Sequence, residues 1–375
     1  MMPVLRTLTS LVWRPGPRAL RGWALASLLA NAIVISTGAA VRLSSSGLGC
    51  PDWPKCTQAS AVAAHASGQT TLNTWIEFGN RLLNFPLVAI AGLTFIAFLR
   101  YYQTSGRTRR DLVWLSALLP LGVVAQAVVG GLVVLSKLNP AMVAAHFLLS
   151  AALILTSAVV LHARASVLVN PNALAGVGPR DVVRPVRPDL RVTAGVLTGF
   201  TGLMLAAGTV VTGTGPLAGT EIDSDGHLHT VPRFHFSLEE VTQLHADIAW
   251  IISALTLALV IGLRFAGGAP RTKRLGWMVL GGLGAQIVIG YVQYFNHLPA
   301  GLVWVHVSCA VVIWIFVLQL FLSTGNGRPR AAGRAAGAGT EAHPGTEAGP
   351  GTGSAAGNGQ PTTAGHDLTG VRPNA

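Results

Sequence analysis

Charged side chains are scarce in this sequence: Asp, Glu, Lys and Arg together make up 11% of its 375 residues. Acidic residues are the rarer sign, with 14 Asp and Glu against 26 Lys and Arg, and Cys occurs only 3 times. Length alone would allow two or three soluble domains, but a 51% hydrophobic composition and a mean hydropathy of +0.53 exclude them. The composition predicts an all-α membrane protein that crosses the bilayer several times.

The net charge of +12 raises the alternative of a nucleic-acid partner. No basic surface with interleaved aromatic residues accompanies that charge, however. The Arg and Lys residues gather instead in the connections between apolar runs, as membrane topology requires. We therefore expect a membrane environment and no nucleic-acid partner.

Eight apolar runs approach the length of about twenty residues that is needed to cross roughly 30 Å of hydrocarbon. They are expected near residues 22–41, 76–99, 112–135, 141–163, 192–213, 241–263, 275–295 and 300–322. A cleaved signal peptide is the alternative for the first run, which is long for that purpose.

The loops between these runs alternate in charge. Loops 100–110, 164–191 and 264–274 are rich in Arg and Lys, whereas loops 42–75 and 214–240 have few of them. Positive loops stay on the cytoplasmic side of a membrane. The pattern predicts a multi-pass protein of the plasma membrane with both termini in the cytoplasm.

Two stretches of the chain are copies of each other. The first reads AQAVVGGLVVLSKLNPAMVAAHF and ends at Phe147, and the second reads AQIVIGYVQYFNHLPAGLVWVHV and ends at Val307. Each copy carries one Gln and, near its end, one His. Because the second copy begins four runs after the first, an even number, both enter the membrane in the same orientation, which predicts two pseudo-symmetric four-helix bundles.

The expected organisation follows from this repeat. A cytoplasmic N-terminus precedes an N-terminal bundle, and a cytoplasmic linker leads to a C-terminal bundle. The tail is rich in Gly, Ala, Thr and Pro, and is expected to be disordered and cytoplasmic. The boundaries are 1–21, 22–165, 166–191, 192–323 and 324–375.

Three histidines share one depth within the predicted spans: His146, His245 and His306, each about four to six residues into a run that enters from the outer face. Ionisable groups inside a membrane are costly and are therefore functional candidates. Neutral imidazoles from facing helices suit axial ligation of a haem iron, which we expect of His245 and His306. Interhelical hydrogen bonding is the structural alternative, and the lack of further ligands disfavours zinc.

The first half differs from the second at the position that matches His245. The repeat places Asn80 there, and Glu77, Asn80 and Arg81 share one helix face. A carboxylate beside an incompletely coordinated iron site suggests a reaction centre, whereas the second half resembles a closed electron-transfer site. The alternative for Glu77 and Arg81 is a simple helix pair near the membrane surface.

Cys50 and Cys56 lie six positions apart in the first outer loop, on the oxidising side of the membrane. This placement favours a disulfide. A redox-active pair and a metal site are the alternatives.

Six motifs, taken together over residues 22–322, resemble the heme A synthase family: GAAVRLSSSGLGCPDWPKC, WIEFGNRLL, LNPAMVAAHF, GTVVTGTGPLAGT, LHADIAW and LPAGLVWVHV. The resemblance implies an oxidoreductase that oxidises the C8 methyl of haem O to a formyl group by successive hydroxylation. The product, haem A, serves aa3-type cytochrome oxidases.

The resemblance also implies a set of site residues. His245 and His306 would be the axial ligands of haem b, while Glu77, Asn80 and His146 would line the haem O site, with His146 as an iron ligand. Arg42 and Arg81 complete the expected cofactor-binding set.

The chain departs from the family at Asn80, where many members carry His, and this leaves the second ligand of the substrate iron open. The implied partners are the haem O synthase (a protohaem farnesyltransferase) and cytochrome oxidase assembly factors, and a homo-oligomer is left open. The main competing interpretation is a non-catalytic di-haem electron carrier or the anchor of a quinol oxidoreductase, which would favour ligands in both halves. A transporter would instead place its polar groups at the midplane.

Overall fold

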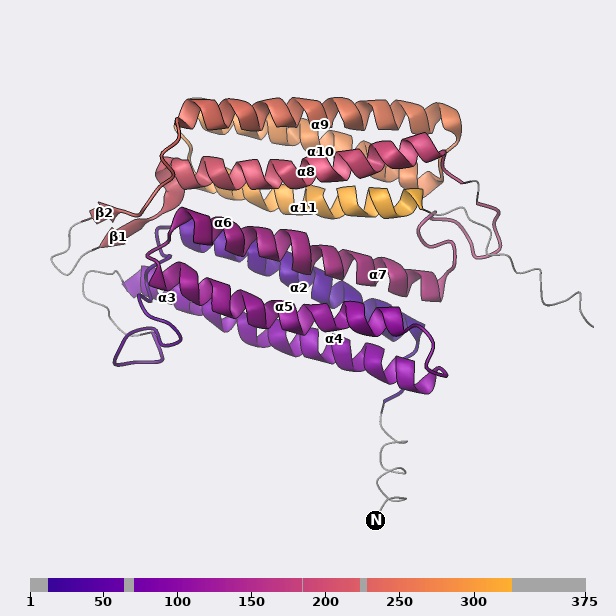
Figure 1. The fold of residues 1–375 in the computed structure, drawn as a ribbon, viewed down its shortest axis with the longest axis horizontal. Coiled ribbons are helices and arrows are strands. Elements are labelled where there is room, and N and C mark those ends of the chain that lie inside the picture. The colour runs from indigo at the N-terminus through magenta and orange to yellow at the C-terminus, as the bar shows by residue number, and fades with distance from the viewer. Residues whose placement is uncertain (1–12, 64–70, 184, 223–227, 326–375) are drawn as a thin grey trace, which may run out of the picture. The chain divides into compact units, whose positions relative to one another are not determined.

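The computed structural model describes residues 13–63, 71–183, 185–222 and 228–325 (Figure 1). The described residues belong to one compact unit, within Met1–Arg328, and Pro329–Ala375 is assigned to a second unit. The second unit and the first twelve residues lie outside the described part of the chain, and so do most of the predicted tail and part of the predicted N-terminal segment.

Eight membrane-length apolar spans are present among the described residues, which confirms the predicted all-α membrane fold with eight spans, while the pseudo-symmetry of the two bundles stays a prediction. Two of them are interrupted: α3 is followed by α4, and α6 continues through a π-helix, η1, into α7. The helices are α2 (Pro17–Leu43), α3 (Thr71–Leu82), α4 (Asn84–Thr104), α5 (Arg110–Leu135), α6 (Pro140–Leu148), η1 (Leu149–Leu155), α7 (Thr156–Val169), α8 (Pro188–Thr214), α9 (Leu238–Ala266), α10 (Pro270–Phe295) and α11 (Ala300–Thr324).

The helix ends follow from local chemistry. Proline occupies the first turn of α2, α6, α8 and α10. Backbone N–H groups in the first turn have no acceptor within the helix, so the N–H that proline lacks costs no hydrogen bond there. Helix α9 begins after Ser237, whose side chain accepts the N–H of Glu240, and ends at Gly267 in the left-handed conformation. These signals lie outside the apolar runs, which is why most of the helices extend several residues beyond the predicted spans.

The helices pack around two cores. The second core is built from α8, α9, α10 and α11 alone, whereas the first core also includes Val311, Trp314 and Leu318 of α11. In the first half, α2 contacts α4 and α7, and α5 also contacts both; in the second, α8, α9, α10 and α11 contact one another in cyclic order (Figure 1). Leu20, Phe98 and Leu155 are buried in the first core, and Leu197 and Val279 in the second. The halves meet where α11 packs on α2 and α7, and where α6 packs on α8.

The contact between the halves includes a hydrogen bond that the sequence gave no reason to expect. The indole Nε1–H of Trp314 in α11 donates to the carbonyl oxygen of Ala151 in η1, at 2.9 Å. A π-helix departs from the α-helical hydrogen-bond pattern, which leaves some carbonyl oxygens free to accept other donors, and it is often found near functional sites. Here it begins three residues after His146, so a second-half side chain is anchored close to a predicted first-half ligand.

The loops after α2, α5 and α8 are tied to the helix ends by a small apolar cluster of Leu48, Val134, Leu138, Ala218 and Val231. The loop after α8 also forms a short antiparallel hairpin of β1 (Thr220–Ile222) and β2 (Leu228–Thr230), with Glu221 opposite His229. This hairpin lies at the same end of the helices as α3 and the first turns of α6 and α9 (Figure 1).

Candidate functional site

The imidazoles of His245 and His306 face each other inside the second half. His245 lies seven residues into α9 and His306 six residues into α11. Their ring centres are 6.4 Å apart and the ring planes are inclined by 51°. Neither imidazole forms a hydrogen bond with another described residue, and the Nδ1 atom of each is buried without a partner. Buried polar atoms normally have partners, so this pair calls for an explanation.

A metal ion between the two rings fits the observed spacing. An imidazole nitrogen lies about 1.1 Å from its ring centre, and a metal–imidazole bond is about 2.0 Å long. Two imidazoles on opposite sides of one ion would therefore have ring centres about 6 Å apart, close to the observed 6.4 Å. His245 and His306 could hold a haem iron in this way.

Glycines on the neighbouring helices make room for these imidazoles. A Cβ atom at Gly208 in α8 would lie 3.2 Å from Cε1 of His245, and one at Gly290 in α10 would lie 3.7 Å from Cε1 of His306. In the first half, a Cβ atom at Gly130 in α5 would lie 3.1 Å from Cε1 of His146. Each predicted ligand is thus paired with a glycine on the preceding helix.

The sequence repeat extends to the backbone contacts that fix two of these helices. The amide of Gln126 donates to the carbonyl oxygen of His146 at 2.9 Å, and the amide of Gln286 donates to that of His306 at 3.0 Å. The Nδ1 atom of His146 is also buried without a partner. His146 therefore has the same local setting as His306.

Asn80 breaks this pattern. Its side-chain Oδ1 atom is buried without a partner. In the preceding span, Gly38 of α2 corresponds to Gly208 of α8 by the repeat, but a Cβ atom at Gly38 would meet nothing within 4 Å. Where the second half has an imidazole against its glycine, the first half therefore has open space beside Gly38 and an unpartnered amide oxygen at Asn80.

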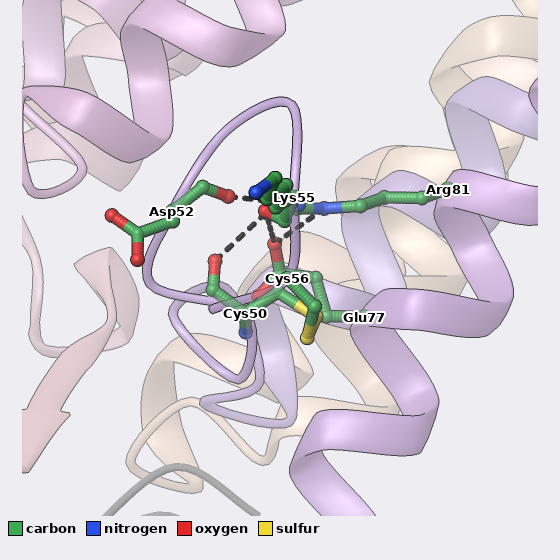
Figure 2. Close-up of polar contacts among 6 residues, drawn as sticks. All are labelled: Cys50, Asp52, Lys55, Cys56, Glu77 and Arg81. Carbon is green, nitrogen blue, oxygen red and sulfur yellow. Dashed lines mark hydrogen bonds and ion pairs between the residues drawn. A yellow bond between two sulfur atoms is a disulfide. The ribbon is translucent and has the colours of Figure 1, made fainter. Parts of the chain in front are cut away.

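Glu77 and Arg81 hold the loop that follows α2 (Figure 2). The buried Glu77 carboxylate accepts the N–H of Cys50 at 2.7 Å through Oε2, and its Oε1 accepts Nε–H of Arg81 at 3.0 Å. The Arg81 guanidinium also donates to the carbonyl oxygens of Cys50, Asp52 and Lys55 at 2.7, 2.9 and 3.1 Å. The helix pair considered as the structural alternative is thus present, and it also clamps the loop.

The loop is closed by a disulfide between Cys50 and Cys56, as the sequence predicted. The remaining expected cofactor-binding residue, Arg42, donates to the carbonyl oxygens of Thr212 and Ala218 at 2.9 and 3.3 Å. These contacts link α2 to the outer end of α8. Roles for Arg42 and Arg81 in cofactor binding stay predictions.

The sequence reasoning missed Trp53, which lies in the disulfide loop. Its indole packs directly on α5, where a Cβ atom at Gly131 would come within 2.5 Å of Trp53 Cδ2. Gly131 follows Gly130, the residue that faces His146. The consecutive glycines were the available signal, because the second copy has Gly290 followed by Tyr291.

A hollow of about 320 Å³ elsewhere is not part of this site. It is lined by Arg271, Arg274 and Met278 of α10, among others. Arg271 lies at the start of α10 and Gly290 near its end, so the hollow and the histidines are at opposite ends of the helix.

Residues 21–318 match the family described as COX15-CtaA, cytochrome oxidase assembly protein. The chain belongs to this family. Among its relatives, the "Heme A synthase" of Azorhizobium caulinodans is 27% identical over 355 residues, which cover 83% of this chain and 95% of that protein. The "Heme A synthase" of Methylorubrum extorquens strain PA1 is 29% identical over 350 residues, covering 80% and 86%. The resemblance expected from the motifs is confirmed.

All predicted site residues of this COX15-CtaA family member lie inside the matched segment. The structure brings His245 and His306 face to face and gathers Glu77 and Arg81 around the disulfide loop. Within the described residues, no group of three or more His, Cys, Asp or Glu side chains is placed to hold a metal ion. The candidate site is therefore built from pairs of side chains.

Proposed function

We propose that this chain acts as a heme A synthase, an oxidoreductase that oxidises the C8 methyl group of haem O to a formyl group. The observation that carries the proposal is the facing, unpartnered imidazole pair of His245 and His306, combined with its incomplete copy at Asn80 and His146. Membership of the COX15-CtaA family and the similarity to proteins named heme A synthase support the same activity.

In this proposal the second half, residues 192–323, holds haem b between His245 and His306. The bound iron supplies one-electron transfer. The chain contributes two apolar helices that keep both imidazoles at one depth, glycines that admit the rings, and the Gln286 contact that fixes the start of α11.

The first half, residues 22–165, takes haem O as substrate, with His146 as the iron ligand. In this scheme water supplies the oxygen atom, so conversion of the methyl to a formyl group consumes one water molecule and releases four electrons and four protons, and an external electron acceptor finally takes up the electrons. The substrate site therefore needs a proton acceptor and an electron acceptor. Glu77 is the proton acceptor, since its carboxylate is buried and oriented by Cys50 and Arg81. The first electron acceptor is the haem of the second half.

Asn80 keeps the substrate side of the site open. The unpartnered Oδ1 atom of Asn80 is suited to bind a water molecule rather than the iron, and no imidazole lies against Gly38. A site with one imidazole ligand leaves room for successive hydroxylation, whereas the second half is closed by two. This asymmetry disfavours the carrier interpretation, which needs closed sites in both halves.

We further propose that the chain is a plasma-membrane protein with both termini in the cytoplasm. The alternating charge of its loops supports this orientation. Both haem sites then lie near the outer surface, and the haem O synthase that makes the substrate is the expected partner.

The decisive test is pigment analysis. Cells producing this chain together with a haem O synthase are extracted with acid–acetone, and the haems are identified by mass. Formylated haem supports the enzyme, and its absence from cells in which haem O accumulates would contradict it. Protohaem as the sole pigment bound to the purified chain would favour the electron carrier.

A further inference from the structure

Trp53 and His146 approach the same short segment of α5 from different parts of the chain. A Cβ atom at Gly131 would lie 2.5 Å from Trp53 Cδ2, and one at Gly130 would lie 3.1 Å from His146 Cε1. Gly130 and Gly131 are consecutive in α5 and point about 100° apart around the helix, so the imidazole and the indole contact adjoining faces of the same turn. The loop after α2 thus reaches the turn of α5 that also borders His146.

The base of this loop is firmly held. Cys50 and Cys56 are buried and joined by a disulfide. Arg81 donates to three loop carbonyls, Glu77 accepts the Cys50 N–H, and a Cβ atom at Gly49 would be only 2.5 Å from the backbone oxygen of Asn73. Trp53, by contrast, remains 41% exposed. Because Arg81 also binds the carbonyl oxygens of Asp52 and Lys55, the backbone is held on both sides of Trp53, and only its partly exposed side chain is left free to move.

The matching position of the second half is occupied differently. Its counterpart of Gly131 is Tyr291, whose ring stacks on Phe295 of the same helix with ring centres 6.3 Å apart and planes inclined by 16°. In the second half the aromatic side chains at this position therefore come from α10. In the first half the position is Gly131, and the indole of Trp53, from the loop after α2, fills the space that a side chain would take.

We propose that Trp53 is a movable aromatic cover of the first-half site, positioned by the Arg81–Glu77 clamp, which governs how fast a porphyrin enters and leaves. This rests on the proposed function, in which the first half handles a substrate and the second half a resident cofactor. An indole offers a large flat apolar face that suits a macrocycle. An indole that rotates about its own side-chain bonds can uncover the site while the clamped loop and the bundle stay in place, as a passing substrate requires and a resident cofactor does not.

The experiment measures haem release from the full-length purified protein loaded with ferric protohaem as the probe. Transfer to excess apomyoglobin is followed by stopped-flow absorbance. The second-half haem is recognised by its bis-imidazole low-spin spectrum. Trp53→Ala should accelerate release from the first half about tenfold, equivalent to about 1.4 kcal/mol, and leave the second-half phase unchanged.

Gly131→Ala is the companion variant, because the added methyl group would displace the Trp53 ring from the other side of the contact. It should accelerate the same phase, and the double variant should be no faster than the faster single variant, since both changes remove one contact. Gly92→Ala in α4 is the matched control, because a Cβ atom there meets nothing within 4 Å. The low-spin spectrum reports that each variant is folded.

The possible outcomes distinguish the proposed role of Trp53 from the proposed substrate site in the first half. First-half haem that leaves at the same rate from wild type, Trp53→Ala and Gly131→Ala would overturn the cover alone. Absence of any first-half haem, even in the wild type, would contradict the proposed substrate site and the cover with it.

Discussion

The imidazole rings of His245 and His306 face each other across the second half of the molecule, with centres 6.4 Å apart and without a hydrogen-bond partner for either Nδ1 atom. This spacing leaves room for one metal ion between them. The corresponding positions of the first half, His146 and Asn80, supply only one imidazole. The predictions below test this difference and the residues around it.

Replacing either His245 or His306 with Ala should abolish the low-spin bis-imidazole spectrum of the purified protein, because one axial ligand is lost. Absorption and electron paramagnetic resonance spectra of the ferric protein are the measurement. His297→Ala is the control, since that side chain is exposed. A bis-imidazole signal that survives either ligand variant would show that the ligand assignment is wrong.

Gly208→Val should weaken haem binding in the second half. The added side chain would press on His245, whose Cε1 atom is already 3.2 Å from a Cβ atom at this position, and overpacking of this kind typically costs about 1–3 kcal/mol. We expect roughly a tenfold or greater rise in the dissociation constant for ferric protohaem. Gly199→Val, in the same helix but with open space around it, should leave haem binding unchanged. Equal affinities in the two variants would contradict the prediction.

Asn80→His should complete the first-half pair. With a second imidazole in the space beside Gly38, haem bound there should become low-spin, and the yield of haem A should fall because the open side of the iron is closed. The spectrum of the loaded protein and the extracted pigment give independent readouts. A first-half haem whose spin state does not change would argue against the correspondence between Asn80 and His245.

Glu77→Gln should keep haem b but stop the reaction at haem O or at its alcohol intermediate. Glutamine retains an oxygen that can accept the Cys50 N–H, but it cannot take up a proton or pair with the charge of Arg81. Mass analysis of extracted haems measures the effect, and the low-spin spectrum checks the second half. An unchanged yield of haem A would remove Glu77 from the chemistry and leave it as a clamp of the loop.

Properties set by short stretches of sequence could be predicted. Eight spans follow from apolar length, because any chain segment that crosses the bilayer must satisfy its own backbone hydrogen bonds as a helix. The sequence alone also shows the two copies that carry His146 and His306. It shows that Asn80 stands where the second half has His245. The disulfide of Cys50 with Cys56 was favoured by their proximity and their outer loop.

Only the tertiary structure decided which distant groups meet. Nothing local to Arg81 indicates that its guanidinium binds three carbonyls of the preceding loop, or that Arg42 reaches the end of α8. The contact of Trp53 with Gly131 and that of Trp314 with the π-helix likewise join segments far apart in the chain. Such partners are selected by how helices pack and loops fold back over their ends, and that depends on the shape of the whole assembly rather than on the residues beside each group.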